Sequence, residues 1–467
     1  MSAFSAVVHL IYLGTAASFV LGLHLMNSPA TARRGNQLSA GGMAVAVATT
    51  VVVLIHDGAI GVGGWLVLVA GGALGTALGA YAARSVAMTA MPQLVSLFNA
   101  VGGGAAALLA INDLVRDGVA TRTTAVTGAL DILIGGITFS GSLIAAGKLQ
   151  GVITSAPVVF PGARVLNAVL AAGLFGGAGW LIAAPDQTAP LVLLVLASLA
   201  FGITMVLPIG GADMPVVISL LNAFTGTAVA MAGFVLGNVV LIIAGALVGA
   251  SGGILTKLMA DAMNRSIPNI IIGGFGTGDS APAIGAGAGA TVRSVSVDDV
   301  AIQLAYASKV IIVPGYGLAA AQAQHEVAEL ADMLSRRGVD VEYAIHPVAG
   351  RMPGHMNVLL AEANVPYPLL KEMDEVNPEF ARTDVALVIG ANDVTNPAAR
   401  RPGNAISGMP ILDVDQAKSI IVIKRSMGHG YAGIDNELYT NPHTGMLFAD
   451  AKKGLAQLTS AVKTLVG

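Results

Sequence analysis

The sequence contains no cysteine and few charged residues. The absence of cysteine from its 467 residues excludes a disulfide framework and any metal or redox centre built on thiolates. Only 11% of the residues are charged, against about 25% in soluble domains, which argues against a wholly soluble protein. With 55% hydrophobic residues and little charge, the chain is not expected to be disordered. Its net charge of −3 gives no excess of positive charge that would indicate binding to nucleic acid.

The charged residues that are present are unevenly distributed. Residues 1–260 contain 14 of them and residues 261–467 contain 37. We therefore predict a transmembrane domain over 1–260, a linker over 261–300 and a soluble domain over 301–467. No cleavable signal peptide is expected, because no basic segment precedes the first apolar run and this run is long enough to span a bilayer.

Apolar runs of about 20 residues recur through the first part. They predict nine membrane-spanning helices, at 4–26, 38–56, 62–82, 91–111, 125–147, 164–184, 189–208, 214–236 and 238–258. Glycines spaced by four, which let helices approach closely in lipid, indicate tight packing at two sets of positions. These are Gly71, Gly75 and Gly79, and Gly245, Gly249 and Gly253.

Basic residues in the loops predict the orientation of these spans. An odd number of spans puts the two ends of the chain on opposite sides. Seven basic residues flank the side of the C-terminal domain: Arg33, Arg34, Arg84, Lys148, Arg164, Lys257 and Arg265. Only Arg116 and Arg122 flank the other side. Positively charged loops stay in the cytoplasm, so the C-terminal domain is predicted to be cytoplasmic.

The linker and the C-terminal part have different patterns. The glycine-rich string at 273–278 follows a short apolar run and could form a phosphate loop, but no helical pattern follows it, so a hinge is favoured. From residue 301, short apolar strands alternate with helices, which predicts a doubly wound, Rossmann-like parallel sheet. The expected strands are Lys309–Pro314, Val339–His346, Val385–Gly390 and Ile420–Lys424; the expected helices are Leu318–Arg337, Gly354–Ala363 and Gly445–Val466.

A dinucleotide fingerprint lies between the first strand and the first helix of this domain. It is Gly-x-Gly-x-x-Ala, in which Gly315 permits a tight turn, Gly317 lets the backbone approach a pyrophosphate and Ala320 packs closely. An ordinary strand–helix turn is the alternative. The second strand is not followed by the carboxylate that binds an NAD ribose. Lys424-Arg425-Ser426 instead offers two cations and a hydroxyl that suit a 2′-phosphate, which favours NADP over NAD. A solvated pair of charges without a ligand is the alternative explanation of Lys424 and Arg425.

Other polar residues are candidates for proton chemistry. Asp393 follows a strand at the edge where such sheets bind ligands, and an Asx-type turn is the alternative. Ionisable or strongly polar residues in spans are functional candidates by default. The candidates in the membrane part are His9, His24, His56, Asn99, Asp131, Ser142, Asp213 and Asn222. Interfacial placement is the simpler reading for the three histidines, and structural hydrogen bonding competes with a proton role for the two asparagines.

Several catalytic motifs are missing from the sequence. It has no His-Glu-x-x-His, Walker motif or serine nucleophile elbow, so no metal site is predicted. It also has one convincing dinucleotide fingerprint. If the protein transfers hydride between two nucleotides, the second nucleotide must therefore bind to another chain.

Taken together, these strings resemble the beta subunit of proton-translocating NAD(P)+ transhydrogenase over essentially the whole chain. The resemblance is densest at 313–317, 345–363, 372–375, 388–393, 408–410, 424–432 and 447–452. It implies NADP(H) bound in an orientation reversed from ordinary Rossmann enzymes. The implied cofactor residues, with the fingerprint glycines, are Gly315, Tyr316, Gly317, Val348, Ala349, Gly350, Arg351, Met352, Pro353, Gly390, Ala391, Asn392, Asp393, Val394, Gly408, Met409, Lys424, Arg425, Ser426, Met427, Gly428, His429, Gly430, Tyr431, Asp450 and Ala451.

The resemblance also implies roles for some of these residues. Lys424, Arg425 and Ser426 would hold the 2′-phosphate, Arg351 would serve the pyrophosphate, and 424–431 would form a lid. Asp393 would sense protonation near the nicotinamide. The implied proton path comprises Asn99, Asp131, Ser142, Asp213 and Asn222. Asn99 matches a position where some family members carry histidine, so a proton-accepting histidine would have to come from another helix or a partner subunit.

The implied reaction is hydride transfer from NADH to NADP+, coupled to proton entry into the cytoplasm. An alpha subunit would bind NAD(H), two copies of each subunit would assemble, and the complex would lie in the bacterial inner membrane. Two other classes remain open. One is a transporter or channel whose cytoplasmic domain only senses NADP(H), and the other is an inert membrane-anchored scaffold, which leaves the cluster at Lys424–Ser426 unexplained.

Overall fold

The protein forms two compact units in a computed structural model. The helical unit consists mainly of residues up to 209 together with 217–256, and the α/β unit includes all residues from 292 onward. The structure describes residues 3–58, 60–116, 121–154, 157–185, 187–211, 213–264, 266–273, 292–352, 354–404, 406–430 and 432–466. The predicted hinge or phosphate loop falls almost wholly within 274–291, outside the described residues.

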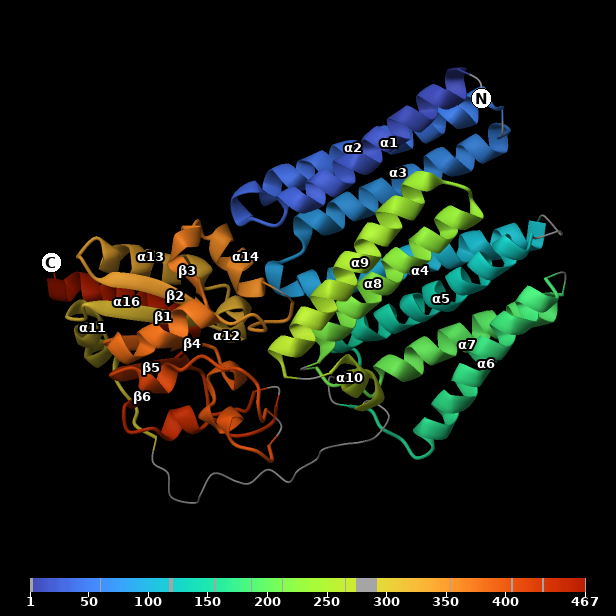
Figure 1. Cartoon of the computed structure of the whole chain (residues 1–467). Helices are drawn as coiled ribbons and strands as arrows, with labels where there is room; N and C mark the ends of the chain where they lie inside the picture. Colours follow the sequence, from blue (N-terminus) through green and yellow to red (C-terminus); the bar gives the residue numbers. More distant parts are fainter. Residues whose placement is uncertain are drawn as a thin grey trace. The chain divides into compact units, whose positions relative to one another are not determined.

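Nine helices within the described residues are long and apolar enough to cross a membrane (Figure 1). They confirm the nine spans predicted from the apolar runs. Their bounds are α1 Ala3–Leu25, α2 Pro29–His56, α3 Val62–Ser85, α4 Met91–Arg116, α5 Arg122–Gln150, α6 Ala163–Ala183, α7 Thr188–Val206, α8 Met214–Val235 and α9 Val239–Ala262. The helix α2 begins well before the predicted start at 38, because the polar residues that precede the apolar run are helical as well.

Glycines bring several of these helices into backbone contact. A Cβ atom built on Gly103 of α4 would lie 2.7 Å from Thr138 of α5, and Gly226 of α8 lies against the backbone of Gly245 and Gly249 of α9. The packing role predicted for these two α9 glycines is therefore confirmed.

The packing role predicted for the other spaced glycines is wrong within this chain. Cβ atoms built on Gly71, Gly75 and Gly79 of α3, or on Gly253 of α9, would meet no atom of the described residues within 4 Å. The α3 glycines therefore lie on a helix surface that no described part of the chain covers.

The second unit is built on a six-stranded parallel sheet (Figure 1). The spatial order is β3-β2-β1-β4-β5-β6, and every neighbouring pair is parallel. This confirms the doubly wound, Rossmann-like sheet. The strands are β1 Lys309–Pro314, β2 Asp340–Ile345, β3 Leu370–Glu372, β4 Val385–Ile389, β5 Ser419–Lys424 and β6 Thr444–Phe448. The helices of this part of the chain are α10 Ile267–Gly273, α11 Val297–Ala305, α12 Tyr316–Ala320, α13 Gln324–Ser335, α14 His355–Glu362, α15 Met373–Val376 and α16 Ala451–Val466.

Two predicted helices are wrong in detail. The helix expected at Leu318–Arg337 is interrupted at Gln322, whose φ of +50° cannot continue a helix, so α12 and α13 are separate. The helix expected at Gly445–Val466 begins only at α16, because its first residues form β6, paired with β5. A Cβ atom on Gly445 would lie 2.7 Å from Val295, so β6 is closely packed there. The short edge strand β3 and the helix α11 were not predicted.

The two faces of the sheet are covered differently. The helices α11 and α13 both pack on α16. Alternate residues of β1, β4 and β5, including Ile311, Val388 and Val422, instead join a buried cluster with Phe380, Leu412, Leu438 and other residues of loops and short helical turns. From β1 the chain continues to β2, toward one edge of the sheet, and from β4 it continues to β5, toward the opposite edge. The topological switch point, where such folds bind ligands, therefore lies between the carboxyl ends of β1 and β4.

Candidate functional site

The switch point is occupied by two glycine turns in direct contact. Gly315 and Gly317 follow β1, and their amides donate hydrogen bonds to the carbonyls of Ile389 and Gly390 at 2.9 and 3.0 Å. Gly390 has a φ of +66°, and a Cβ atom built on Gly317 would lie 2.6 Å from the Gly390 Cα. The fingerprint glycines are thus required by the approach of two protein loops. Their predicted contact with a pyrophosphate stays a prediction.

An aromatic–cation stack lies beside these turns. The Arg351 guanidinium sits 4.3 Å from the centre of the Tyr316 ring, and His355 meets the same ring edge-on at 6.3 Å. The Arg351 amide donates to His355 Nδ1 at 3.1 Å. Burial and the Arg351 charge lower the pKa of His355. The structure therefore brings Tyr316 to Arg351 in the 348–352 loop.

Asp393 lies against the end of the predicted lid. Its Oδ2 accepts a hydrogen bond from the Ala432 amide at 3.0 Å, and a Cβ atom on Gly430 would collide with its carboxylate. Gly430 is thus a position where the lid backbone must approach a side chain closely. This contact joins the segment after β4 to the segment after β5, two groups of predicted cofactor residues that are far apart in the sequence.

Lys424 is held between the lid and a buried tyrosine. Its Nζ donates to the Gly428 carbonyl at 2.5 Å, lies 3.4 Å from the Tyr439 hydroxyl and sits 4.6 Å from the centre of that ring. Burial lowers the pKa of Lys424, and the Asp393 charge opposes this shift. The ammonium is therefore partly shielded from water at the edge of the site, where an anion would feel its charge strongly.

The next lid residues face solvent. Arg425, Ser426 and Met427 are all exposed, and His429 Nδ1 lies 3.2 Å from Asp435 Oδ1. Arg425 and Ser426 extend directly from the end of β5, beside Lys424. Their side chains are thus accessible to a ligand that arrives at this edge of the sheet. Tyr431, the last predicted lid residue, lies outside the described residues, as does Pro353.

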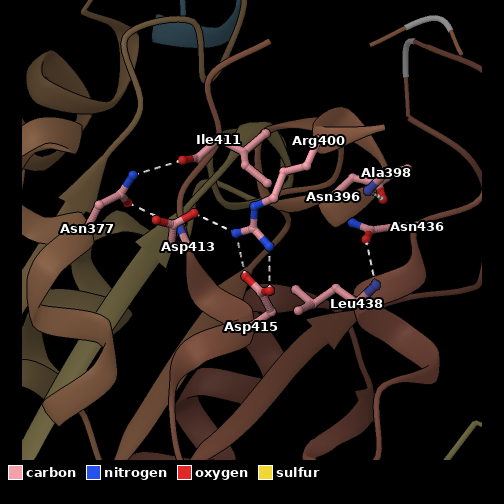
Figure 2. A network of polar contacts seen from close by, with 9 residues as sticks. All are labelled: Asn377, Asn396, Ala398, Arg400, Ile411, Asp413, Asp415, Asn436 and Leu438. Carbon is pink, nitrogen blue, oxygen red and sulfur yellow. Dashed lines mark hydrogen bonds and ion pairs between the residues drawn. The ribbon is translucent and has the colours of Figure 1, made fainter. Parts of the chain in front are cut away.

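Two polar side chains missed by the sequence analysis connect these segments. The Tyr439 hydroxyl lies 3.1 Å from both the Ala391 carbonyl and Asn392 Oδ1, and burial raises the pKa of Tyr439. Asn436 donates to the Asn392 carbonyl at 3.0 Å and accepts from the Leu438 amide at 2.9 Å (Figure 2). No local motif marks either residue, because the partners that they reach in the segment after β4 lie more than 40 positions away.

The Gly408–Met409 segment belongs to a loop fixed by an ion-pair cluster. Gly408 has a φ of +75°, and Met409 packs on a small buried cluster that also touches Ala432. Beyond it, Arg400 pairs with Asp413 and Asp415 at 2.5 and 2.6 Å (Figure 2). Met409 and Ala432, the residue that follows the predicted lid, therefore pack on the same buried cluster.

Asp450 has a structural role that the sequence analysis did not assign. Its Oδ1 accepts hydrogen bonds from the Lys452 and Lys453 amides at 3.2 and 3.4 Å, the geometry of a side chain capping the start of α16. This capping explains Asp450 without a ligand. The cofactor contacts predicted for Asp450 and Ala451 stay predictions.

Three predicted proton-path residues lie near one another in the helical unit. Asn99 is buried, and its side-chain amide donates a hydrogen bond to the Ile218 carbonyl of α8 at 3.3 Å. The backbone carbonyl of Asn99 accepts a hydrogen bond from the Thr225 hydroxyl at 3.3 Å. Asn222 lies on the same face of α8 as Ile218 and Thr225 by helical spacing. Because Gly103 and Leu114 of α4 face Thr138 and Gly128 of α5, the antiparallel register places Ser142 level with Asn99.

Asp131 lies elsewhere in α5. It is fully buried, and neither its carboxylate oxygens nor Ser142 Oγ has a hydrogen-bond partner among the described residues. Asp131 shares the α4-facing stripe with Gly128 and Ser142. Eleven positions separate it from Ser142, about 16 Å along the helix. Asp213, the remaining candidate, directly precedes α8.

Comparisons with known proteins match almost the entire chain. Residues 8–461 match the family described as NAD(P) transhydrogenase beta subunit. Two curated relatives from Rhodospirillum rubrum, both named NAD(P) transhydrogenase subunit beta, are each 50% identical over 461 residues. Each alignment covers 97% of this chain and 98% of the relative.

Proposed function

Because the chain belongs to the NAD(P) transhydrogenase beta-subunit family, we propose that it is the NADP(H)-binding and proton-conducting subunit of a proton-translocating transhydrogenase. In this proposal, NADP(H) binds at the carboxyl edge of the sheet and NAD(H) binds to an alpha subunit. The three parts proposed are a membrane domain over 1–260, a linker over 261–300 and an NADP(H) domain over 301–467. Hydride passes from NADH to NADP+ while a proton enters the cytoplasm.

The observation that carries the proposal is the cluster at the end of β5. The shielded ammonium of Lys424 stands next to the exposed Arg425 and Ser426, at the carboxyl edge of the sheet. Two cations and a hydroxyl suit a 2′-phosphate dianion, and no carboxylate lies in the loop at 346–351, where an NAD ribose would be bound. These residues fit NADP(H) better than NAD(H).

The remaining site residues would bind and orient the nucleotide. The Tyr316–Arg351 stack supplies an aromatic face and a cation suited to the pyrophosphate region. The lid, 424–431, excludes water from the reacting atoms, and Asp393 holds or releases a proton beside the lid end that it contacts. When bound, the nicotinamide ring supplies the hydride chemistry, so no protein nucleophile is needed.

The proposed membrane domain, 1–260, would carry the proton. We propose a path through Asn99, Asp131, Ser142, Asp213 and Asn222, three of which lie near one another between α4, α5 and α8. A charge that crosses the full membrane potential contributes about 2.3 kcal/mol per 100 mV. This energy can shift the relative affinities for NADP+ and NADPH only through states that differ in protonation.

The location and assembly follow from the same reasoning. The excess of basic residues on one side supports a cytoplasmic NADP(H) domain. The bacterial inner-membrane location is proposed from the family resemblance. A single dinucleotide fingerprint supports a separate alpha subunit for NAD(H). The proposed assembly has two copies of each subunit, as the family resemblance implies.

The site assignment is tested by nucleotide binding to the full-length protein in detergent. NADP(H) affinity is measured with NAD(H) as competitor, for the unmodified protein, Lys424→Ala and Arg425→Ala. Arg337→Ala removes an exposed cation at the end of α13 and serves as the matched control. We expect preference for NADP(H), lost in the first two variants and kept in the third. Equal affinity for both nucleotides would refute the 2′-phosphate assignment and favour an NADP(H)-independent role for this cluster.

A further inference from the structure

His346 is a buried histidine with a hydrogen-bond partner for each ring nitrogen. It directly follows β2 and is 1% exposed. Its Nε2 lies 2.8 Å from the carbonyl oxygen of Pro410, and its Nδ1 lies 3.2 Å from the amide of Val348. One contact is local, and the other reaches across 64 positions of the sequence.

These partners determine the protonation state of the ring. A backbone amide can only donate, so Nδ1 accepts and carries no proton, whereas a carbonyl can only accept, so Nε2 carries the proton. Burial lowers the pKa of His346 to about 4, against an opposing effect of the Pro410 hydrogen bond. The ring is therefore neutral near pH 7, and both of its hydrogen bonds persist there.

The two partners belong to different walls of the proposed nucleotide site. Val348 begins the loop that carries Arg351, the residue stacked on Tyr316. Pro410 directly follows Gly408 and Met409. The Pro410 segment is also anchored from its far end, where Asn377 donates to the Ile411 carbonyl at 3.0 Å and accepts from the Asp413 amide at 3.1 Å (Figure 2).

We propose that His346 is a positioning residue that holds the Val348–Met352 loop and the Gly408–Met409 loop at a fixed separation, and that NADP(H) affinity depends on this bridge. The inference rests on the proposed function, because both loops are walls of the proposed NADP(H) site. Loss of the bridge lets the two walls move apart, so the free protein must be reordered each time the nucleotide binds.

Two substitutions separate the two hydrogen bonds. In His346→Asn, the side-chain oxygen can replace Nδ1 as the acceptor for Val348, but no donor reaches Pro410. In His346→Gln, the longer amide can replace Nε2 as the donor to Pro410. The bridge is thus lost in the first variant and kept in the second. His325→Gln changes an exposed histidine of α13 and is the matched control.

The experiment uses the full-length protein assembled with its alpha subunit. Loss of one hydrogen bond that leaves a buried partner unsatisfied corresponds to about a tenfold change in an equilibrium constant. We expect His346→Asn to raise the Kd and KM for NADP+ by about tenfold and His346→Gln by less than about threefold. The KM for NADH should stay unchanged in both, because NADH binds to the other subunit.

Thermal unfolding distinguishes positioning from a merely structural role. If His346 only stabilised the fold, both variants would melt earlier while their folded fraction bound NADP+ with unchanged affinity. That result, or equal affinity in the Asn and Gln variants, would overturn the inference while leaving the proposed function intact. Failure of the unmodified protein to bind NADP(H) would instead refute the proposed function and this inference with it.

Discussion

At the residue scale, the glycine turns of the switch point are a steric requirement. Gly390 combines a φ of +66° with backbone contact to Gly317, whereas Gly338 has a φ of +87° and open space around it. Gly338→Ala should cost only the left-handed backbone strain, about 1–2 kcal/mol. Gly390→Ala should cost about 1–3 kcal/mol more, because the new methyl group also overpacks the turn.

The difference between these two variants is measured by thermal unfolding of the full-length protein, with the melting of its α/β unit as the signal. Equal losses of stability in Gly338→Ala and Gly390→Ala would show that the two loops can separate without cost. The steric explanation of the fingerprint glycines would then be wrong.

The buried His346 also predicts a pH dependence of stability. Its pKa is lowered from an ordinary value near 6.5 to about 4 in the folded protein. As the pH falls, His346 therefore binds a proton in the unfolded chain before it does so in the folded protein. The contribution of neutral His346 to the free energy of unfolding is complete above pH 6.5 and is lost as the pH falls toward 4. At pH 5 the loss should approach about 2 kcal/mol.

His346→Gln removes this titration, so the variant should lose less stability than the unmodified protein between pH 7 and pH 5. Melting temperatures of the α/β unit at the two pH values test the difference. Parallel declines in both proteins would show that His346 does not carry this dependence.

Sequence patterns identified residue types more reliably than their contacts. Lys424, Arg425 and Asp393 were recognisable because charge follows a strand end in each case. The contacts of Tyr439 and His346 depend on partners 48 and 64 positions away. Only the folded chain brings such residues together, so no local pattern could reveal them.

At the scale of elements, Tyr439 joins the segment after β4 to the lid after β5. Its hydroxyl reaches Ala391, and its ring lies beneath Lys424. Tyr439→Phe keeps the ring and should raise the Kd for NADP+ about threefold, the effect of one hydrogen bond. Tyr439→Leu also removes the cation–π contact and should raise it about tenfold or more.

Tyr306→Leu is the control for these variants, because Tyr306 is 83% exposed. Fluorescence titration of the full-length proteins with NADP+ compares them. A Phe variant as weak as the Leu variant would mean that the hydroxyl, rather than the ring, positions Lys424.

Element boundaries were predictable where one pattern dominated. Membrane spans follow from about 20 apolar residues because lipid demands that length. The three-residue strand β3 is too short to show a pattern, and β6 was read as helix because its apolar residues continue into α16. The break between α12 and α13 depends on the backbone of a single residue, Gln322, and composition does not encode it.

The contact between α4 and α5 predicts a role for Asp131. Its buried carboxylate has no hydrogen-bond partner among the described residues and faces α4. Asp131→Asn keeps the shape of the side chain but cannot take up a proton. We expect the variant to bind NADP+ normally and to lose most of its response to a proton gradient in liposomes that contain the alpha subunit.

Asp57→Asn is the control, since Asp57 is an exposed carboxylate beyond the end of α2. If Asp131→Asn responded to the gradient as fully as Asp57→Asn, the proposed proton path would have to bypass Asp131.

At the scale of the whole molecule, charged residues are unevenly divided between the two units, and a different role is proposed for each. The helical unit carries few charged residues, and its isolated polar groups lie between helices. The α/β unit carries the cationic cluster at Lys424–Ser426 and the loops that would orient a nucleotide. The central claim is that hydride transfer in the second unit is coupled to proton movement through the first.

The most direct test follows deuterium from labelled NADH to NADP+ in liposomes that contain both subunits, with the α/β unit facing outward. The account predicts that deuterium appears in NADPH, that an acidic lumen accelerates the transfer, and that a proton ionophore abolishes the acceleration. A transfer rate indifferent to the gradient, or no transfer at all, would contradict it.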